Sequence, residues 1–115
     1  MRKKVIQIGL EFVFGPLLKN EDDQNGNPCT GVRIVDENES IQSLDKEIGE
    51  LWCSLYSKDD NAVDGLHFDD TREKELAPIL LEKINLLIIM LNEINDGSYE
   101  IDDMITSYLK ILITE

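Results

Sequence analysis

Few residues in this sequence could carry out chemistry. His67 is the only histidine, and Cys29 and Cys53 are the only cysteines. Nucleophilic catalysis assisted by histidine would therefore depend on His67 together with Cys53. Cys53 follows Trp52 beside an apolar helical stripe, where a cysteine usually behaves as a small hydrophobic side chain. We expect no catalytic residues and no enzymatic activity.

Two loops contain a glycine next to carboxylate or amide side chains, as calcium-binding loops do. Such a loop needs oxygen ligands at positions 1, 3 and 5, glycine at position 6 and glutamate at position 12. When the pattern is aligned on Asn25-Gly26 or Asp64-Gly65, the twelfth residue is Val32 or Thr71. The sequence also lacks a phosphate-binding glycine loop and the histidines of a multi-histidine metal site. We therefore expect neither a metal nor a cofactor.

Negative charge is the strongest feature of the composition. The 115 residues include 24 Asp or Glu against 11 Lys or Arg, which gives a net charge of −13 and a pI near 4.3. Nucleic acids and anionic membranes attract cationic proteins, so this charge argues against both as partners. The carboxylates that we expect to contact a partner fall in two segments: Glu21, Asp22, Asp23, Glu37 and Glu39, and then Asp59, Asp60, Asp64, Asp69 and Asp70.

These clusters of carboxylates have two interpretations. A net charge far from zero keeps a small protein soluble and monomeric. Solubility does not require like charges to cluster, however, and clustered charges repel one another. Trp52 and Tyr56 are one helical turn apart beside the acidic segment, where aromatic side chains suit either an interface with a basic protein or ordinary core packing. The clustering favours a surface for a basic protein.

Strands are predicted near the start of the chain. Apolar residues alternate over residues 5–14, which predicts a strand that ends at Gly15-Pro16. Residues 31–36 predict a second strand, antiparallel to the first across a polar loop. Leu66-His67-Phe68 is suited to a further, very short strand.

Helical spacing of apolar residues then predicts a helix over residues 41–56, with Asp45 among its polar residues. Asp70-Thr71-Arg72-Glu73 has the form of a capping box at the start of a second helix. Within that helix, Pro78 predicts either a kink or a fresh start one turn later. Residues 79–94 are apolar on more than one face, which is typical of a central helix or an oligomer interface.

A last helix is predicted over residues 101–112, capped by Ser98, with a tail at 110–114 that is also suited to a strand. The fold class is therefore α+β, in a single domain over residues 1–115. We expect a small antiparallel sheet from the two N-terminal strands, with about three helices packed on one face. Because two strands alone are marginal, a third strand or another chain should complete the sheet.

The chain is expected to be a soluble protein of the cytoplasm. No apolar run approaches the ~20 residues that a membrane helix needs. Met1-Arg2-Lys3-Lys4 resembles the start of a signal peptide, but Gln7 and Glu11 interrupt the apolar stretch and no small-residue cleavage site follows.

The small size, the acidity and the acidic loops at 21–23 and 59–70 make the chain similar to the immunity proteins of bacterial toxin systems, which include those of colicins and of contact-dependent growth inhibition. The resemblance implies a cationic toxin domain as partner, often a nuclease, whose active or nucleic-acid-binding site the carboxylates cover. The free protein would be a monomer or a dimer.

Two other functions are compatible with the sequence. One is an acidic secretion chaperone or adaptor that dimerises through residues 79–94, which an obligate dimer would favour. The other is a nucleic-acid mimic that blocks a DNA-binding enzyme, for which a regular array of carboxylates would be expected.

Overall fold

The computed structural model describes residues 4–10, 15–19, 21–58 and 65–114. Within this part the chain has an α+β fold with four helices and three two-stranded sheets. The strands are β1 (Lys4–Ile8), β2 (Glu21–Asp22), β3 (Pro28–Cys29), β4 (Tyr56–Lys58), β5 (Leu66–Phe68) and β6 (Tyr99–Asp103). The helices are α1 (Arg33–Asp36), α2 (Glu39–Cys53), α3 (Asp70–Ile94) and α4 (Thr106–Thr114).

The central sheet pairs β1 with β6, and the two strands are parallel, with Ile6 opposite Ile101. The prediction of an antiparallel partner at residues 31–36 is wrong, because these residues contain the single helical turn α1. The Asp36 carboxylate accepts hydrogen bonds from the backbone N–H groups of Thr30 (2.9 Å) and Gly31 (3.1 Å), which draws this short segment into a turn.

The alternation predicted for the first strand is confirmed over its described part. Ile6 and Ile8 are buried on one face, while Val5 is exposed on the other. The strand is shorter than predicted, because it ends at Ile8 and the Gly9 N–H donates to the carbonyl of Pro16 (2.9 Å). Residues 11–14 of the predicted strand lie outside the described residues.

The last predicted helix is wrong in its first part. Residues 99–103 form β6, and α4 begins only at Thr106. The helix cap is Asp103 rather than Ser98, since its carboxylate accepts from the backbone N–H groups of Ile105 (3.1 Å) and Thr106 (3.0 Å). The tail at 110–114 is helical, so the strand alternative for it is excluded.

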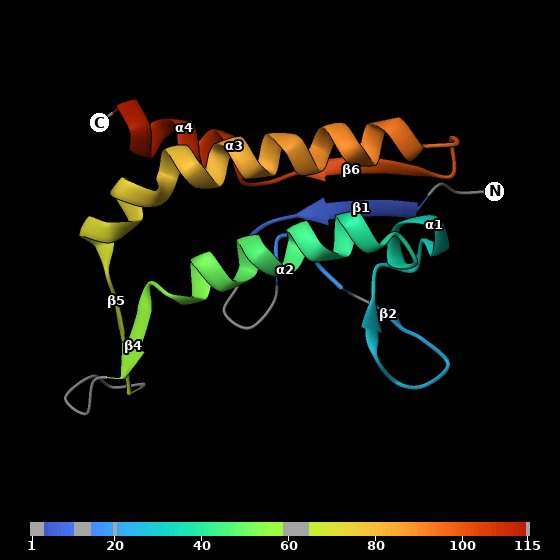
Figure 1. Cartoon of the computed structure of the whole chain (residues 1–115), viewed down its shortest axis with the longest axis horizontal. Helices are drawn as coiled ribbons and strands as arrows, with labels where there is room; N and C mark the ends of the chain where they lie inside the picture. The colour runs from blue at the N-terminus through green and yellow to red at the C-terminus, as the bar shows by residue number, and fades with distance from the viewer. Residues whose placement is uncertain (1–3, 11–14, 20, 59–64, 115) are drawn as a thin grey trace.

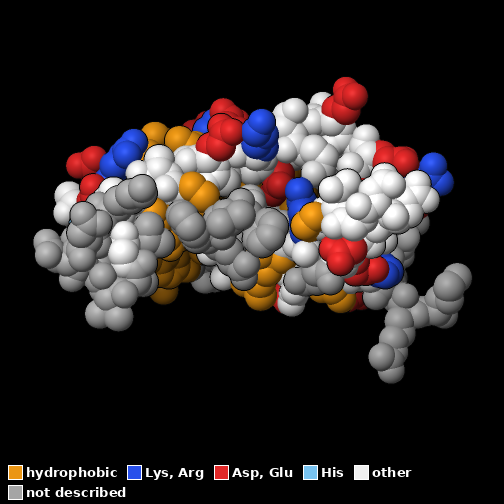
Figure 2. Space-filling view, turned by 90° about the horizontal axis from the view of Figure 1, so that it is seen from below, with side chains coloured by type: hydrophobic (Ala, Val, Ile, Leu, Met, Phe, Trp, Pro, Cys, Tyr) orange, Lys and Arg blue, Asp and Glu red, His pale blue; other side chains and the backbone are white. Residues whose placement is uncertain are grey.

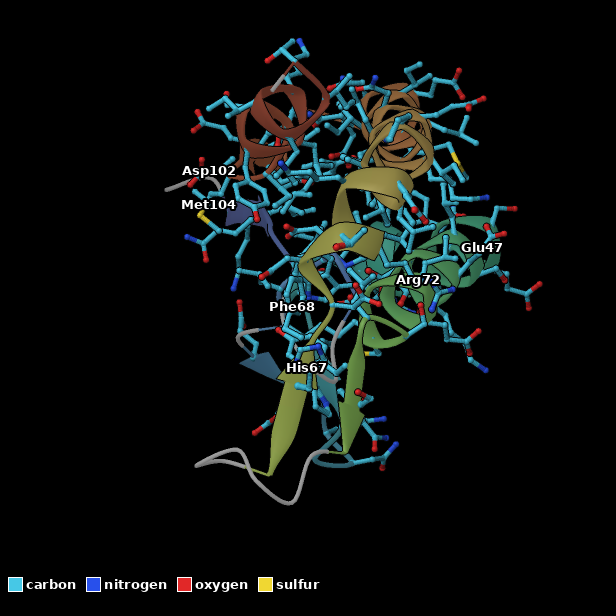
Figure 3. The ribbon with its side chains drawn as sticks, turned by 90° about the vertical axis from the view of Figure 1, so that its left-hand side faces the viewer. Glu47, His67, Phe68, Arg72, Asp102 and Met104 are labelled. Carbon is cyan, nitrogen blue, oxygen red and sulfur yellow. The ribbon has the colours of Figure 1, made fainter. Side chains whose placement is uncertain are left out.

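The two long helices lie on one face of the β1–β6 sheet, in front of it in Figure 1, and Figure 3 shows the same two layers from one end. The N-cap of α2 is Asn38, whose side chain accepts from the Ile41 N–H (3.0 Å). The Asp69 side chain, rather than that of Asp70, caps α3, and α3 continues through Pro78 to Ile94. The core lies between these layers, and it includes Tyr99, whose hydroxyl donates to the Leu91 carbonyl.

Asp45 was predicted to lie on the polar side of α2, but it is buried. Its carboxylate accepts from the backbone N–H of Leu17 (2.8 Å) and lies 3.5 Å from the ammonium of Lys19. The approach is so close that a side chain at Gly15 would lie 2.5 Å from Asp45 oxygens. This contact ties the segment that returns beside β1 to the middle of α2.

Candidate functional site

The described carboxylates of the two predicted acidic segments lie at opposite ends of the molecule, whose longest dimension is 48 Å. In Figure 1 the hairpin β2–β3 and α1 are at the right, while β4, β5 and the start of α3 are at the left. Of the second segment, Asp69 and Asp70 are described, whereas Asp59, Asp60 and Asp64 lie outside the described residues. The described carboxylates of the two segments therefore do not form one continuous patch.

At the right-hand end, most carboxylates of the first segment serve the local structure. Asp23 accepts from the backbone N–H groups of Asn25 (2.8 Å) and Asn27 (3.0 Å), and these bonds hold the pKa of its carboxyl below the usual value. Glu21 pairs with Lys4 (2.7 Å) and Glu37 with Arg33 (3.0 Å).

A polar hollow of about 590 Å³ lies between the β2–β3 loop and α1, and Figure 2 shows carboxylates together with basic side chains at this end of the surface. Asp22 and Glu39 are exposed there without a side-chain partner among the described residues. The arrangement is a well-solvated acidic surface in which part of the charge is already neutralised.

The left-hand end contains an aromatic cluster that sequence reasoning found in part. Trp52 is at the last turn of α2, and Tyr56 starts β4, directly opposite Phe68 of β5. The Phe68 ring lies 5.4 Å from the Trp52 ring and 5.0 Å from the Tyr56 ring, between centroids. The three side chains form a continuous wall. The sequence could have placed Phe68 in the cluster if the short predicted strand at 66–68 had been paired with residues 56–58.

This wall lines one side of a hollow of about 510 Å³. The other side comes from the ends of the parallel strands, and its lining residues are Gly9 and Leu10 after β1, Met104 and Ile105 after β6, and Tyr108 of α4. Because parallel strands end at the same edge of a sheet, their following residues meet there, as they do in many ligand sites. Figure 3 looks at this end and shows Met104 and Phe68 from these two sides.

A buried carboxylate also lines this aromatic pocket. Glu73, in the first turn of α3, is only 5% exposed, and the Tyr108 hydroxyl donates to its Oε2 (2.6 Å). No cationic side chain in the described part of the chain lies within ion-pair distance of it. From the sequence, Glu73 was expected only as part of a capping box. Its spacing with Ala77, Leu80 and Ile84 was the available signal, because these residues share the buried face of α3.

Trp52 contributes a second unmet polar group. The side chain is 7% exposed, and its Nε1–H is buried without a hydrogen-bond partner among the described residues. Buried donors are nearly always paired, because an unpaired one forfeits the hydrogen bond it made to water. An aromatic hollow lined by an uncompensated carboxylate is suited to binding a ligand.

The residues considered for catalysis lie elsewhere. His67 is exposed on β5, Cys53 is half-buried at the end of α2, and neither lines the aromatic pocket. Within the described ranges, no three His, Cys, Asp or Glu side chains are grouped so as to hold a metal ion. Nor is any helix in these ranges both long and apolar enough to cross a membrane.

Comparisons with protein-family models, with curated proteins and with solved structures found no significant similarity.

Proposed function

We propose that this protein binds a basic protein in the cytoplasm and inhibits it, with a cationic toxin, most often a nuclease, as the expected target. The observation that carries the proposal is the aromatic pocket with its uncompensated Glu73 carboxylate, on a chain with a net charge of −13. Aromatic side chains in such a site serve as interface anchors, and surrounding carboxylates accelerate encounter with a basic partner. Inhibition would be steric and electrostatic, because carboxylates would pair with the Lys and Arg that hold nucleic-acid phosphates.

The two ends of the molecule can be tested separately. Asp70, in the first turn of α3 with Glu73, and Asp102 of β6, labelled beside Met104 in Figure 3, are exposed at the pocket end. Asp22 of β2 and Glu39 at the start of α2 are exposed at the opposite end. None of the four has a side-chain partner in the described structure. A double variant, Asp70→Asn with Asp102→Asn, removes two charges at the pocket end. The matched control, Asp22→Asn with Glu39→Gln, removes the same charge from the other end.

The experiment is a tagged pull-down from the source cell, washed at ~50 mM and then ~500 mM salt, which shortens the Debye length from about 14 to about 4 Å. We expect one basic partner that survives the high-salt wash. The purified partner should lose its nuclease activity when this protein is added. The pocket-end variant should slow association several-fold, and the control should not. A partner held only at low salt, or one whose activity is unchanged, would contradict tight inhibition.

A second function has one observation in its favour. Ile79, Leu86 and Ile89 of α3 are about half exposed, on the side of the helix away from its buried stripe. This apolar face suits the alternative of an acidic secretion chaperone that dimerises through α3. The oligomeric state separates the two functions.

A further inference from the structure

We infer that the aromatic pocket receives the guanidinium group of an arginine side chain from the partner. This inference rests on the proposed function, since it names the chemical group that a basic partner would place in this site. It follows from two properties of the pocket: its carboxylate and its aromatic wall.

The carboxylate of Glu73 calls for a cation. It is 5% exposed and accepts a hydrogen bond from one neutral donor, the Tyr108 hydroxyl (2.6 Å), without an ion-pair partner among the described residues. A carboxylate has room for about four hydrogen bonds, so most of its acceptor capacity remains. Interactions between charges are stronger in a partly desolvated site than in water. A guanidinium entering the hollow would supply the missing positive charge and several N–H donors.

The aromatic wall selects arginine over a compact ammonium ion. The Phe68 ring contacts the rings of both Trp52 and Tyr56, and the three side chains line a hollow of about 510 Å³. A planar guanidinium stacks on aromatic faces and is more weakly hydrated than the lysine ammonium, so less hydration is lost when it enters. The volume lies within the usual range of small-ligand pockets, roughly 300–1,000 Å³, and a single long side chain fits in it.

The test uses the intact protein and a probe small enough to need no partner protein. Trp52 is the only tryptophan, so its fluorescence reports on the pocket alone. Acetyl-arginine-amide is titrated at constant ionic strength against acetyl-citrulline-amide, which has nearly the same shape without the charge. We expect the arginine probe to bind at least about tenfold more tightly, since a charge-assisted hydrogen bond and stacking on the rings both depend on the cation.

Variants then assign the effect to the pocket. Glu73→Gln keeps an acceptor for Tyr108 and should reduce the preference for arginine to near unity. The control Glu82→Gln removes an exposed carboxylate from the same helix, away from the aromatic pocket, and should leave the preference intact. If Glu73→Gln fails to fold by circular dichroism, Phe68→Leu provides a second test and should weaken arginine binding several-fold.

Equal affinity for the two probes, or no binding of either, would overturn the inference. Because the titration involves no partner, its failure leaves the pull-down and inhibition results standing on their own. Conversely, arginine binding without a basic partner in the pull-down would retain the pocket's specificity and contradict the toxin inhibitor.

Discussion

At the scale of single residues, Asp45 is a carboxylate held where its charge is unfavourable. Burial raises the pKa of its carboxyl, and the hydrogen bond from the Leu17 N–H and the ammonium of Lys19 offset this only in part. The residue still has a structural purpose, because it satisfies a backbone N–H in the segment that returns beside β1. An uncharged side chain of the same shape could keep that hydrogen bond.

We therefore predict that the free energy of unfolding of Asp45→Asn, relative to that of the wild type, increases as the pH rises. With a raised pKa in the folded state, Asp45 contributes most to stability below its unfolded pKa, near 4, and that contribution is lost as the pH rises through the folded pKa. Relative to wild type, the variant should gain stability between about pH 3 and about pH 7, as measured by urea unfolding. Asp22→Asn, which removes an exposed carboxylate, controls for the change in net charge. An equal difference at both pH values would contradict the prediction.

At the scale of elements, the start of α3 decides where Glu73 lies. The Asp69 carboxylate accepts from the backbone N–H of Arg72 (3.0 Å), and this cap sets the first turn, which carries Glu73 to the buried face. We predict that Asp69→Ala lowers the free energy of unfolding by about 1 kcal/mol, the usual cost of losing an N-cap.

The adjacent Asp70→Ala variant provides the control. Asp70 lies in the first turn, where its carboxylate stabilises the helix only through the helix dipole, by about 0.3–1 kcal/mol. Urea unfolding of the two variants should rank Asp69→Ala as the less stable. The reverse order would instead support the capping box that the sequence suggested, one residue later.

The elements that the sequence predicts correctly are those with a long repeating pattern. Five of the seven apolar residues at helical spacing lie within α2, and the apolar run at 79–94 falls within α3. The helix predicted over 41–56 is too long at its end, because α2 stops at Cys53 and Tyr56 begins β4. The elements that were predicted wrongly are short. Residues 31–36 fit a strand or a helical turn equally well, and local hydrogen bonds to Asp36 decide between them. The strand β6 was missed because the helical spacing of α4 was extended back over residues 101–103. Its parallel partner, β1, is almost the whole chain away, so no local pattern indicates the pairing.

The candidate site shows the same division. The sequence singled out Trp52 and Tyr56 as either interface anchors or core residues, and both line the aromatic pocket. Tyr56 reaches it from β4 and not from the predicted helix. Phe68 and Glu73 were missed because their place depends on the pairing of β4 with β5 and on the rotation of α3. The acidic segments were identified as surface features, but their separation to opposite ends depends on the whole fold.

At the scale of the whole molecule, charge and the exposed apolar face of α3 act against each other. Chains that each carry a net charge of −13 repel, most strongly at low salt. Ile79, Leu86 and Ile89 would favour association, but they share that face with Glu82 and Asn85. Isolated apolar side chains at a surface are ordinary in monomeric proteins.

We therefore predict a monomer by sedimentation velocity at ~50 mM salt, with at most weak association at ~500 mM, where screening shortens the repulsion to about 4 Å. The Leu86→Glu variant places a charge in the middle of the α3 face, and it should sediment as the wild type does at low salt. Glu75→Gln, on an exposed position of the same helix, serves as its control. A stable dimer that persists at low salt and is broken by Leu86→Glu alone would reverse the order of the two functions. The α3 face would then be the working surface of a dimeric chaperone, and the inhibitor would have to act as a dimer or be abandoned.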